Sequence, residues 1–330
     1  MVSLSRLIAA ALALVALPAA AADDRGVNPC DFTGFDKPCK VANGEYRAFK
    51  PYGDGPHPAV VYLYGSTGRA DHRYRDEHFR DAITGRGYVL IVPEALPVVR
   101  YLGGVTDTGW SRAARRDEHP RDDIAFIEAV LDHAQDRFRI DRRRVIFLGQ
   151  SDGGYLLWEI ACHHPRMAAA YAVHAGTYGA PRPPRRCEAP VRFVQTHGRR
   201  DRIVAFEDQD RHPVTGVPYG ANPLEALDTL ARTNGCRPRA EAERSRIAGF
   251  RRTEWRGCRQ GAKLDYLVHG GGHGWPKTWV PTVLDWFEAF DLGPAPVGER
   301  HVRQVGTRGA EGDSRFKTIS SGSRFERAPK

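Results

Sequence analysis

The feature that most constrains the fold of this chain is the pentapeptide GQSDG at residues 149–153, which places Ser151 between two glycines. The pentapeptide follows the apolar run VIFL at 145–148 and precedes a segment with helical character. A serine at such a strand-to-helix turn forms a nucleophile elbow, in which the hydroxyl is held exposed at the edge of a sheet. The glycines let the backbone approach closely there. The motif therefore predicts a sheet with a serine nucleophile at its edge.

A serine hydroxyl needs an adjacent base, and that base is oriented by an acid. Around an elbow of this kind the acid and the histidine follow the serine in that order. The strand-like run at 191–197 leads into Asp201, and the run at 264–268 opens into a glycine-rich loop with His269 and His273. Because the carboxyl ends of parallel strands meet at one edge, Asp201 is expected as the acid and His273 as the base. His269 remains an alternative base.

A second loop is expected to stabilise the oxyanion of the reaction. The buried run at 58–64 is followed by a Gly-Ser-Thr turn at 65–67, and an oxyanion loop belongs upstream of the nucleophile. The backbone N–H groups of Ser66 or Thr67 and of Asp152 are therefore the expected donors. The side chain of Asp152 either shapes the pocket or faces solvent.

The rest of the chain alternates between strand-like and helix-like segments, which predicts the α/β class with a mostly parallel sheet covered on both faces. Residues 23–292 are long enough for one such domain. No P-loop or GxGxxG motif supports nucleotide chemistry. The expected strands lie near 45–50, 58–64, 88–94, 143–149, 168–174, 191–197 and 264–268, and the expected helices include 122–138, 222–234 and 279–290.

Four motifs, GQSDGG, HGRRDRIV, GGGHGWP and ACHHP, make residues 28–291 resemble the poly(3-hydroxybutyrate) depolymerases. These are relatives of feruloyl and acetylxylan esterases in the α/β-hydrolase superfamily. The resemblance implies an α/β-hydrolase fold with Ser151 as nucleophile, Asp201 as acid and His273 as base. It also implies esters of short hydroxyacyl or aryl acids as substrates.

The substrate pocket is expected to depart from that family at one position. Tyr64 stands where the family has a histidine before glycine, which changes the polarity of the acyl pocket. Trp275 corresponds to an aromatic residue that follows the family's catalytic histidine, and it either lines the pocket or packs at its rim. Trp110, in the long loop 101–120, is a further pocket candidate.

The first 22 residues read as a signal peptide, with a basic residue, an apolar stretch and a run of alanines. A secreted or periplasmic protein is therefore expected, without stable membrane insertion because the stretch is short for a span. Six cysteines fit an oxidising compartment. CxxC spacing is absent, so no metal site and no cofactor are expected. Neighbourhood along the chain favours the pairs Cys30 with Cys39, Cys162 with Cys187, and Cys236 with Cys258.

The formal net charge of +9 does not by itself indicate a nucleic-acid partner. Residues 293–330 hold eight Lys or Arg against four Asp or Glu, without an apolar period, and this tail is expected to be disordered. The expected partner is a small or oligomeric ester. The sequence thus predicts an exported serine esterase that forms an acyl-enzyme. A serine peptidase on the same fold and a catalytically silent binding protein remain alternatives.

Overall fold

The computed structural model describes residues 30, 37–66, 68, 70, 76–99, 106–111, 121–180, 182–206, 220–259, 261–290 and 292. Three predicted features lie outside the described residues: the signal peptide, the basic tail and the oxyanion donor Thr67.

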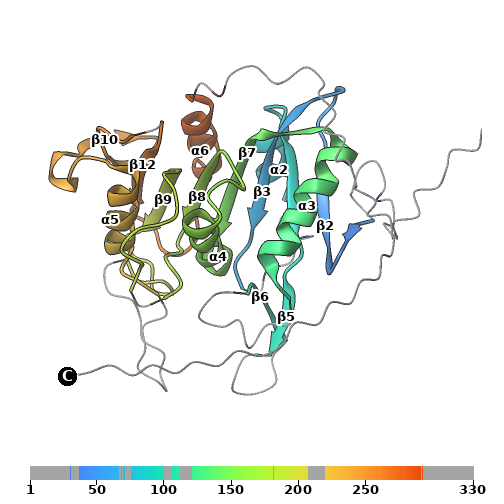
Figure 1. The fold of residues 1–330 in the computed structure, drawn as a ribbon, viewed down its shortest axis with the longest axis horizontal. Helices are drawn as coiled ribbons and strands as arrows, with labels where there is room; N and C mark the ends of the chain where they lie inside the picture. The colour runs from blue at the N-terminus through green and yellow to red at the C-terminus, as the bar shows by residue number, and fades with distance from the viewer. Residues whose placement is uncertain are drawn as a thin grey trace, which may run out of the picture. The chain divides into compact units, whose positions relative to one another are not determined.

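The described residues are organised around one ten-stranded sheet with the strand order β1-β2-β4-β3-β7-β8-β9-β12-β11-β10 (Figure 1). The strands from β4 to β12 in this order run parallel, and antiparallel pairs extend the sheet at both ends. A separate two-stranded sheet pairs β5 with β6. The strands are β1 (Cys39–Val41), β2 (Gly44–Phe49), β3 (His57–Leu63), β4 (Val89–Pro93), β5 (Leu96–Val99), β6 (Thr106–Gly109), β7 (Ile140–Gln150), β8 (Ala170–His174), β9 (Arg192–Gly198), β10 (Glu243–Ile247), β11 (Phe250–Glu254) and β12 (Lys263–His269).

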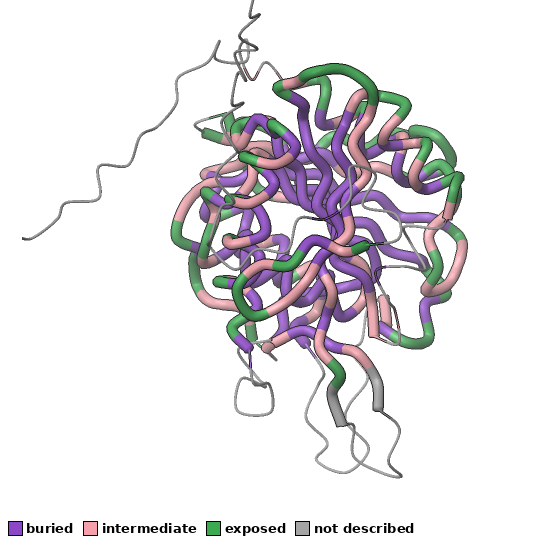
Figure 2. The backbone as a smooth tube through the Cα atoms, turned by 90° about the vertical axis from the view of Figure 1, so that its right-hand side faces the viewer, coloured by how far each residue is buried: buried purple, intermediate pink, exposed green. Residues whose placement is uncertain are grey.

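Helices cover both faces of the sheet. Neighbouring strand residues point to opposite faces. On β9, Gln195 accepts a hydrogen bond from Trp158 of α4 at 3.0 Å, and Thr196 accepts one from Trp279 of α6 at 2.9 Å. Therefore α4 and α6 lie on opposite faces, and the buried strands between them form the core (Figure 2). The helices are α2 (Glu77–Thr84), α3 (Asp123–Phe138), α4 (Ser151–His163), α5 (Pro223–Asn234), α6 (Trp279–Glu288) and the 3-10 turn η2 (Arg239–Glu241).

Local sequence accounts for the ends of these helices. Asp122 caps α3 by accepting from the backbone N–H groups of Ile124 and Ala125 at 3.0 and 3.1 Å. Asn222 caps α5 in the same way, and Gly235 ends that helix with a φ of 62°. Each side-chain cap stabilises its helix by about 1 kcal/mol.

The expected α/β architecture is confirmed, and each expected strand corresponds to one of the observed strands. The hairpin β10–β11 was not anticipated. All five residues of β10 are exposed and most are charged, so the segment lacks the alternation of apolar residues that marks a strand. β10 forms a strand because it pairs with β11, which in turn pairs with β12. Ala248 and Gly249, at φ values of 48° and 89°, form the two-residue turn that such hairpins favour.

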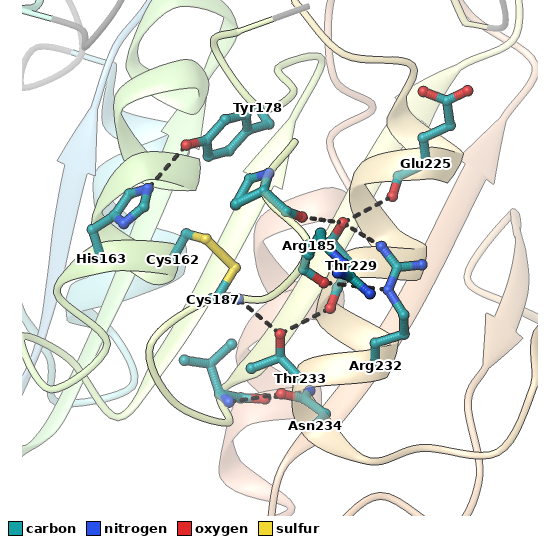
Figure 3. Close-up of a disulfide and its surroundings, with 12 residues drawn as sticks. Cys162, His163, Tyr178, Arg185, Cys187, Glu225, Thr229, Arg232, Thr233 and Asn234 are labelled. Atoms are coloured by element: carbon teal, nitrogen blue, oxygen red, sulfur yellow. Dashed lines mark hydrogen bonds between the residues drawn. A yellow bond between two sulfur atoms is a disulfide. The ribbon is translucent and has the colours of Figure 1, made fainter. Parts of the chain in front are cut away.

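Three disulfides join Cys30 to Cys39, Cys162 to Cys187, and Cys236 to Cys258, the pairs expected from the sequence. The second of them connects the end of α4 to the segment before β9 (Figure 3). Cys187 also donates its backbone N–H to Thr233 of α5 at 2.9 Å. This disulfide therefore holds two helices on one face of the sheet.

Candidate active site

Ser151 lies at the sharp turn between β7 and α4, as the pentapeptide predicts. Its φ is +50°, a left-handed conformation that costs a residue with a side chain about 1–2 kcal/mol. The two glycines of the motif are required by close approach: a Cβ on Gly149 would lie 2.8 Å from the carbonyl oxygen of Gly153, and one on Gly153 would lie 2.2 Å from that of Leu63. The turn is therefore strained and tightly enclosed by backbone.

The elbow sits where the strand order reverses. The chain passes from β3 to β4 on one side and later to β7 on the other, and such a switch point is where open α/β sheets place ligands. Gly65, just after β3, packs against the elbow, since a Cβ there would lie 2.9 Å from the Cβ of Ser151. Gly153 donates its backbone N–H to the carbonyl of Tyr64 at 3.1 Å. The loop with Ser66 and the first turn of α4 with Asp152 therefore flank Ser151.

The side chain of Asp152 braces this loop. It is 4% exposed, and its Oδ2 accepts a hydrogen bond from the backbone N–H of Trp110 at 3.0 Å. The indole Nε1 of Trp110 donates in turn to the carbonyl of Tyr64 at 2.8 Å. Asp152 thus connects the elbow to the segment after β3 through Trp110, a contact that the sequence did not indicate.

The structure places the other two pocket candidates in packed surroundings. Tyr64 is 1% exposed, and its hydroxyl oxygen accepts from the backbone N–H of Ala95 at 2.7 Å. Burial, followed by the nearby carboxylate of Glu94, raises the pKa of Tyr64. Trp275 is half-buried in an aromatic cluster, stacked on Phe79 and Trp279 at centroid distances of 5.9 and 5.0 Å.

Asp201 and His273 lie together, although 72 residues separate them in the chain. The Nδ1 of His273 is 2.9 Å from Oδ2 of Asp201. The other carboxylate oxygen accepts from the backbone N–H groups of Ile203 and Val204 at 2.9 and 3.0 Å. Burial alone would raise the pKa of Asp201, but these hydrogen bonds, led by that of His273, outweigh it and hold the pKa below its ordinary value. Asp201 is therefore an ionised acceptor beside an imidazole.

His269 has both ring nitrogens engaged within the protein. Gly271 donates its backbone N–H to Nδ1 of His269 at 3.1 Å, so the ring proton is on Nε2. That Nε2 lies 3.1 Å from Nε2 of His174, which consequently accepts. His269 therefore organises the loop that carries His273, and it contacts His174 rather than Asp201. Sequence reasoning missed His174, because nothing in its neighbourhood distinguishes it from a core residue at the end of β8.

The buried histidines predict that the protein loses stability in mild acid. Burial, followed by the neighbouring histidines, holds the pKa of His174 well below its usual value, and burial also lowers the pKa of His197. In the unfolded chain these groups take up protons near pH 6.5. Protons then bind the unfolded state more readily, so the free energy of unfolding falls below that pH, by up to about 1.4 kcal/mol per pH unit per histidine.

Urea unfolding between pH 5.5 and pH 8 measures this slope. The variant His174→Gln is expected to be less stable at pH 8 but to show a flatter pH dependence, because one buried site that resists protonation is gone. Equal slopes for the variant and the native protein would contradict the prediction.

Comparison with known proteins adds an independent finding. No protein-family model matches the chain. NocK of Nocardia uniformis subsp. tsuyamanensis, named as an inferred esterase, is 27% identical over 264 residues, which cover 73% of this chain and 74% of that protein. Feruloyl esterase D of Neurospora crassa is 27% identical over 58% of this chain and 55% of its own length. The solved acetyl xylan esterase of Aspergillus awamori superposes with a TM-score of 0.53 at 17% identity, covering 74% of this chain and 94% of that one.

The fold and these relatives define the class: the chain is a carboxylic ester hydrolase of the α/β-hydrolase fold. Within that class the curated relatives are esterases, and three of them are of the feruloyl type and are matched over about half of their own length. They agree with a feruloyl esterase-like family.

Two further findings concern the described residues alone. Their helices are all too short or too polar to cross a bilayer. No group of three or more His, Cys, Asp or Glu side chains in these segments could hold a metal ion.

Proposed function

We propose that the protein is a serine esterase in which Ser151 is the nucleophile, His273 the base and Asp201 the acid. The observation that carries this proposal is the 2.9 Å contact between Asp201 and His273, two residues 72 apart in sequence. It supports the proposal because both residues follow the carboxyl ends of parallel strands, β9 and β12, and Ser151 follows β7 at the same edge.

The reaction follows from this arrangement. An ionised Asp201 accepts a hydrogen bond from Nδ1–H of His273, which leaves Nε2 free to take the proton of Ser151 as its oxygen attacks the ester carbonyl. The backbone N–H groups of Ser66 and Asp152 stabilise the oxyanion, at about 3 kcal/mol per donor. His273 then protonates the leaving alcohol, and water releases the acid from the acyl-enzyme by the same steps in reverse.

We further propose short-chain acyl, hydroxyacyl or aryl-acid esters as substrates. The esterase names of the relatives support the reaction class, and feruloyl and acetyl groups are the acids in the names of two of them. The packing of Tyr64 against Trp110 supports a small acyl site, because both rings are buried beside Ser66 and lie at a centroid distance of 5.5 Å.

A substrate panel tests this proposal. Acetyl and butyryl aryl esters are expected to show higher kcat/KM than esters with chains beyond about eight carbons, because a small site cannot bury the additional methylenes. Peptide anilides, which the same three residues could cleave, serve as the comparison that tests a peptidase. Faster cleavage of anilides than of esters, or a preference for long chains, would contradict the proposal. Absence of turnover on the whole panel would favour a silent binding protein.

We also propose that residues 1–22 direct export and are then removed. The three disulfides support this, because disulfides persist in oxidising compartments. The intact mass of protein from exporting cells tests it, since a full-length chain would contradict removal.

A further inference from the structure

A basic groove lies on the hairpin β10–β11, away from the residues of the proposed triad. A cavity of about 680 Å³ opens between this hairpin, β12 and the start of α5. Among its lining residues are Arg239, Arg244, Arg246 and Arg251, and none of its lining residues is acidic. The strands β12, β11 and β10 form one end of the ten-stranded sheet, and α5 lies beside them (Figure 1).

The hairpin separates its charges by face. Residue pairs directly opposite one another point to the same side of a sheet. Arg246 lies opposite Arg251, and Arg244 lies opposite Thr253, so the three arginines share the groove face. Glu243 and Glu254, which are also opposite one another, point to the other face.

On that other face the charges are matched. Arg252, which also borders the cavity, lies 2.6 Å from Asp265 and 2.9 Å from Glu254, and Arg256 pairs with Glu243. By contrast, Arg244, Arg246 and Arg251 have no acidic partner among the residues that the structure describes. Like charges directly opposite one another destabilise a hairpin. The groove face therefore retains an unfavourable charge arrangement that an anionic ligand would relieve.

Two further observations describe the walls of this groove. Trp255 lines the same cavity, is 2% exposed, and has a buried Nε1 without an acceptor in the described part of the chain. An indole nitrogen can only donate. A second cavity of about 570 Å³ shares Arg239 and Arg244 with the first and continues along the end of α5. The second cavity is also lined by Asp228, 3.8 Å from Arg239, so basic side chains predominate along an elongated surface whose far part contains an ion pair.

One end of the groove lies near the carboxyl end of β12, the strand that precedes the loop of His273. Arg251 is opposite Val268, the residue before His269. On the other face of the hairpin, the ring of Phe250 packs edge-on against His269 at 6.0 Å. At the hairpin turn, the carbonyl of Ala248 accepts from Thr278 at 3.1 Å, a few residues beyond that loop. A long ligand lying in the groove could therefore extend to the carboxyl edge of the sheet, where Ser151 lies.

We propose that this groove binds the carboxylates of a uronic acid-containing polysaccharide, whose ester groups are hydrolysed at Ser151. The second half of this inference rests on the proposed function. Arginine pairs with carboxylates through two parallel hydrogen bonds, which suits a chain of repeated carboxylates. A single-stranded nucleic acid fits less well, because its bases stack on exposed aromatic rings and the aromatic residues of this groove, Trp255 and Tyr266, are buried.

Titration calorimetry of the full-length protein tests the binding half. A hexamer of galacturonic acid is expected to bind, with an affinity that falls as salt is added, and a hexamer of xylose is not. The double variant Arg246→Gln, Arg251→Gln should weaken binding at least about tenfold. Its melting temperature should equal or exceed that of the native protein, because a repulsive pair has been removed. A melting temperature at or above that of the native protein would show that the variant is folded.

The matched control is Arg143→Gln with Arg166→Gln, which removes the same charge from two exposed positions outside the groove, one near the start of β7 and one just before β8. It should leave the affinity within about twofold of the native value, since neither arginine lines the groove. Equal weakening in the control variant would overturn the proposal. So would absence of binding, equal binding of the xylose hexamer, or tighter binding of a thymidylate hexamer.

The catalytic half is measured as a ratio of kcat/KM values, for acetylated polygalacturonate over an acetyl aryl ester. The Arg246→Gln, Arg251→Gln variant should lower this ratio at least about tenfold, because the polymer loses its anchoring contacts. An unchanged ratio with weakened hexamer binding would overturn the link to the ester site. Binding by the Ser151→Ala protein distinguishes this failure from failure of the proposed function, because calorimetry does not require a nucleophile.

Discussion

The variant Ser151→Ala is expected to lose ester hydrolysis by about 10⁵- to 10⁶-fold in kcat, because the acyl-enzyme can no longer form. Alanine retains the Cβ atom, so it experiences the same positive φ of 50° and the same close contact with Gly65 as the native serine. The free energy of unfolding should therefore change little. Steady-state kinetics on an acetyl aryl ester, with a urea unfolding curve, measure both quantities.

A covalent probe supplies the control for that experiment. A fluorophosphonate should label the native protein on the peptide that contains Ser151, and the alanine variant should remain unlabelled. Turnover within about tenfold of the native rate in a fully folded Ser151→Ala protein would exclude Ser151 as the nucleophile.

The second large effect is expected from His273→Ala, which should lower kcat by about the same factor as loss of the serine, because members of a triad act as a unit. The double variant with Ser151→Ala should consequently be no worse than either single variant. Only His273 contacts Asp201 among the two histidines of this loop. Kinetics of the three variants on one ester measure this non-additivity.

His269→Ala is the matched control, at the end of β12 and four residues before His273. It leaves His174 and the backbone N–H of Gly271 without their partners, which should destabilise the protein by about 1–3 kcal/mol for each buried group. Displacement of the loop should lower activity by about 10- to 100-fold, far less than loss of His273. A larger kinetic loss in His269→Ala than in His273→Ala would reverse the assignment of the base.

The strands of the sheet interior could be predicted because their signal is local. All seven residues of β3 are buried, and the run of apolar residues is visible in the sequence without knowledge of its neighbours. The hairpin β10–β11 could not be predicted in this way. Its residues are charged, and its pairing depends on β12, which follows later in the chain. Edge strands of this kind are defined by a partner rather than by their own composition.

The candidate site also combines features that the sequence predicts with features that only the structure reveals. The elbow at Ser151 and the order of Asp201 and His273 can be read from short motifs. The brace from Asp152 through Trp110 to Tyr64 cannot, because its hydrogen bonds span 42 and 46 residues. The sequence also left open whether His269 or His273 contacts Asp201. The contact of His269 with His174, 95 residues away, distinguishes the two.

The sequence by itself therefore determined the features that backbone sterics enforce within a few residues: the strained turn at Ser151, the glycines around it and the caps of α3 and α5. Cysteine neighbourhood also indicated the disulfide pairs. Only the tertiary structure decided which histidine meets Asp201, and that Arg246 and Arg251 oppose one another without acidic partners in the described segments. The physical reason is that strand register and side-chain packing bring distant residues together, and neither is encoded in a local pattern.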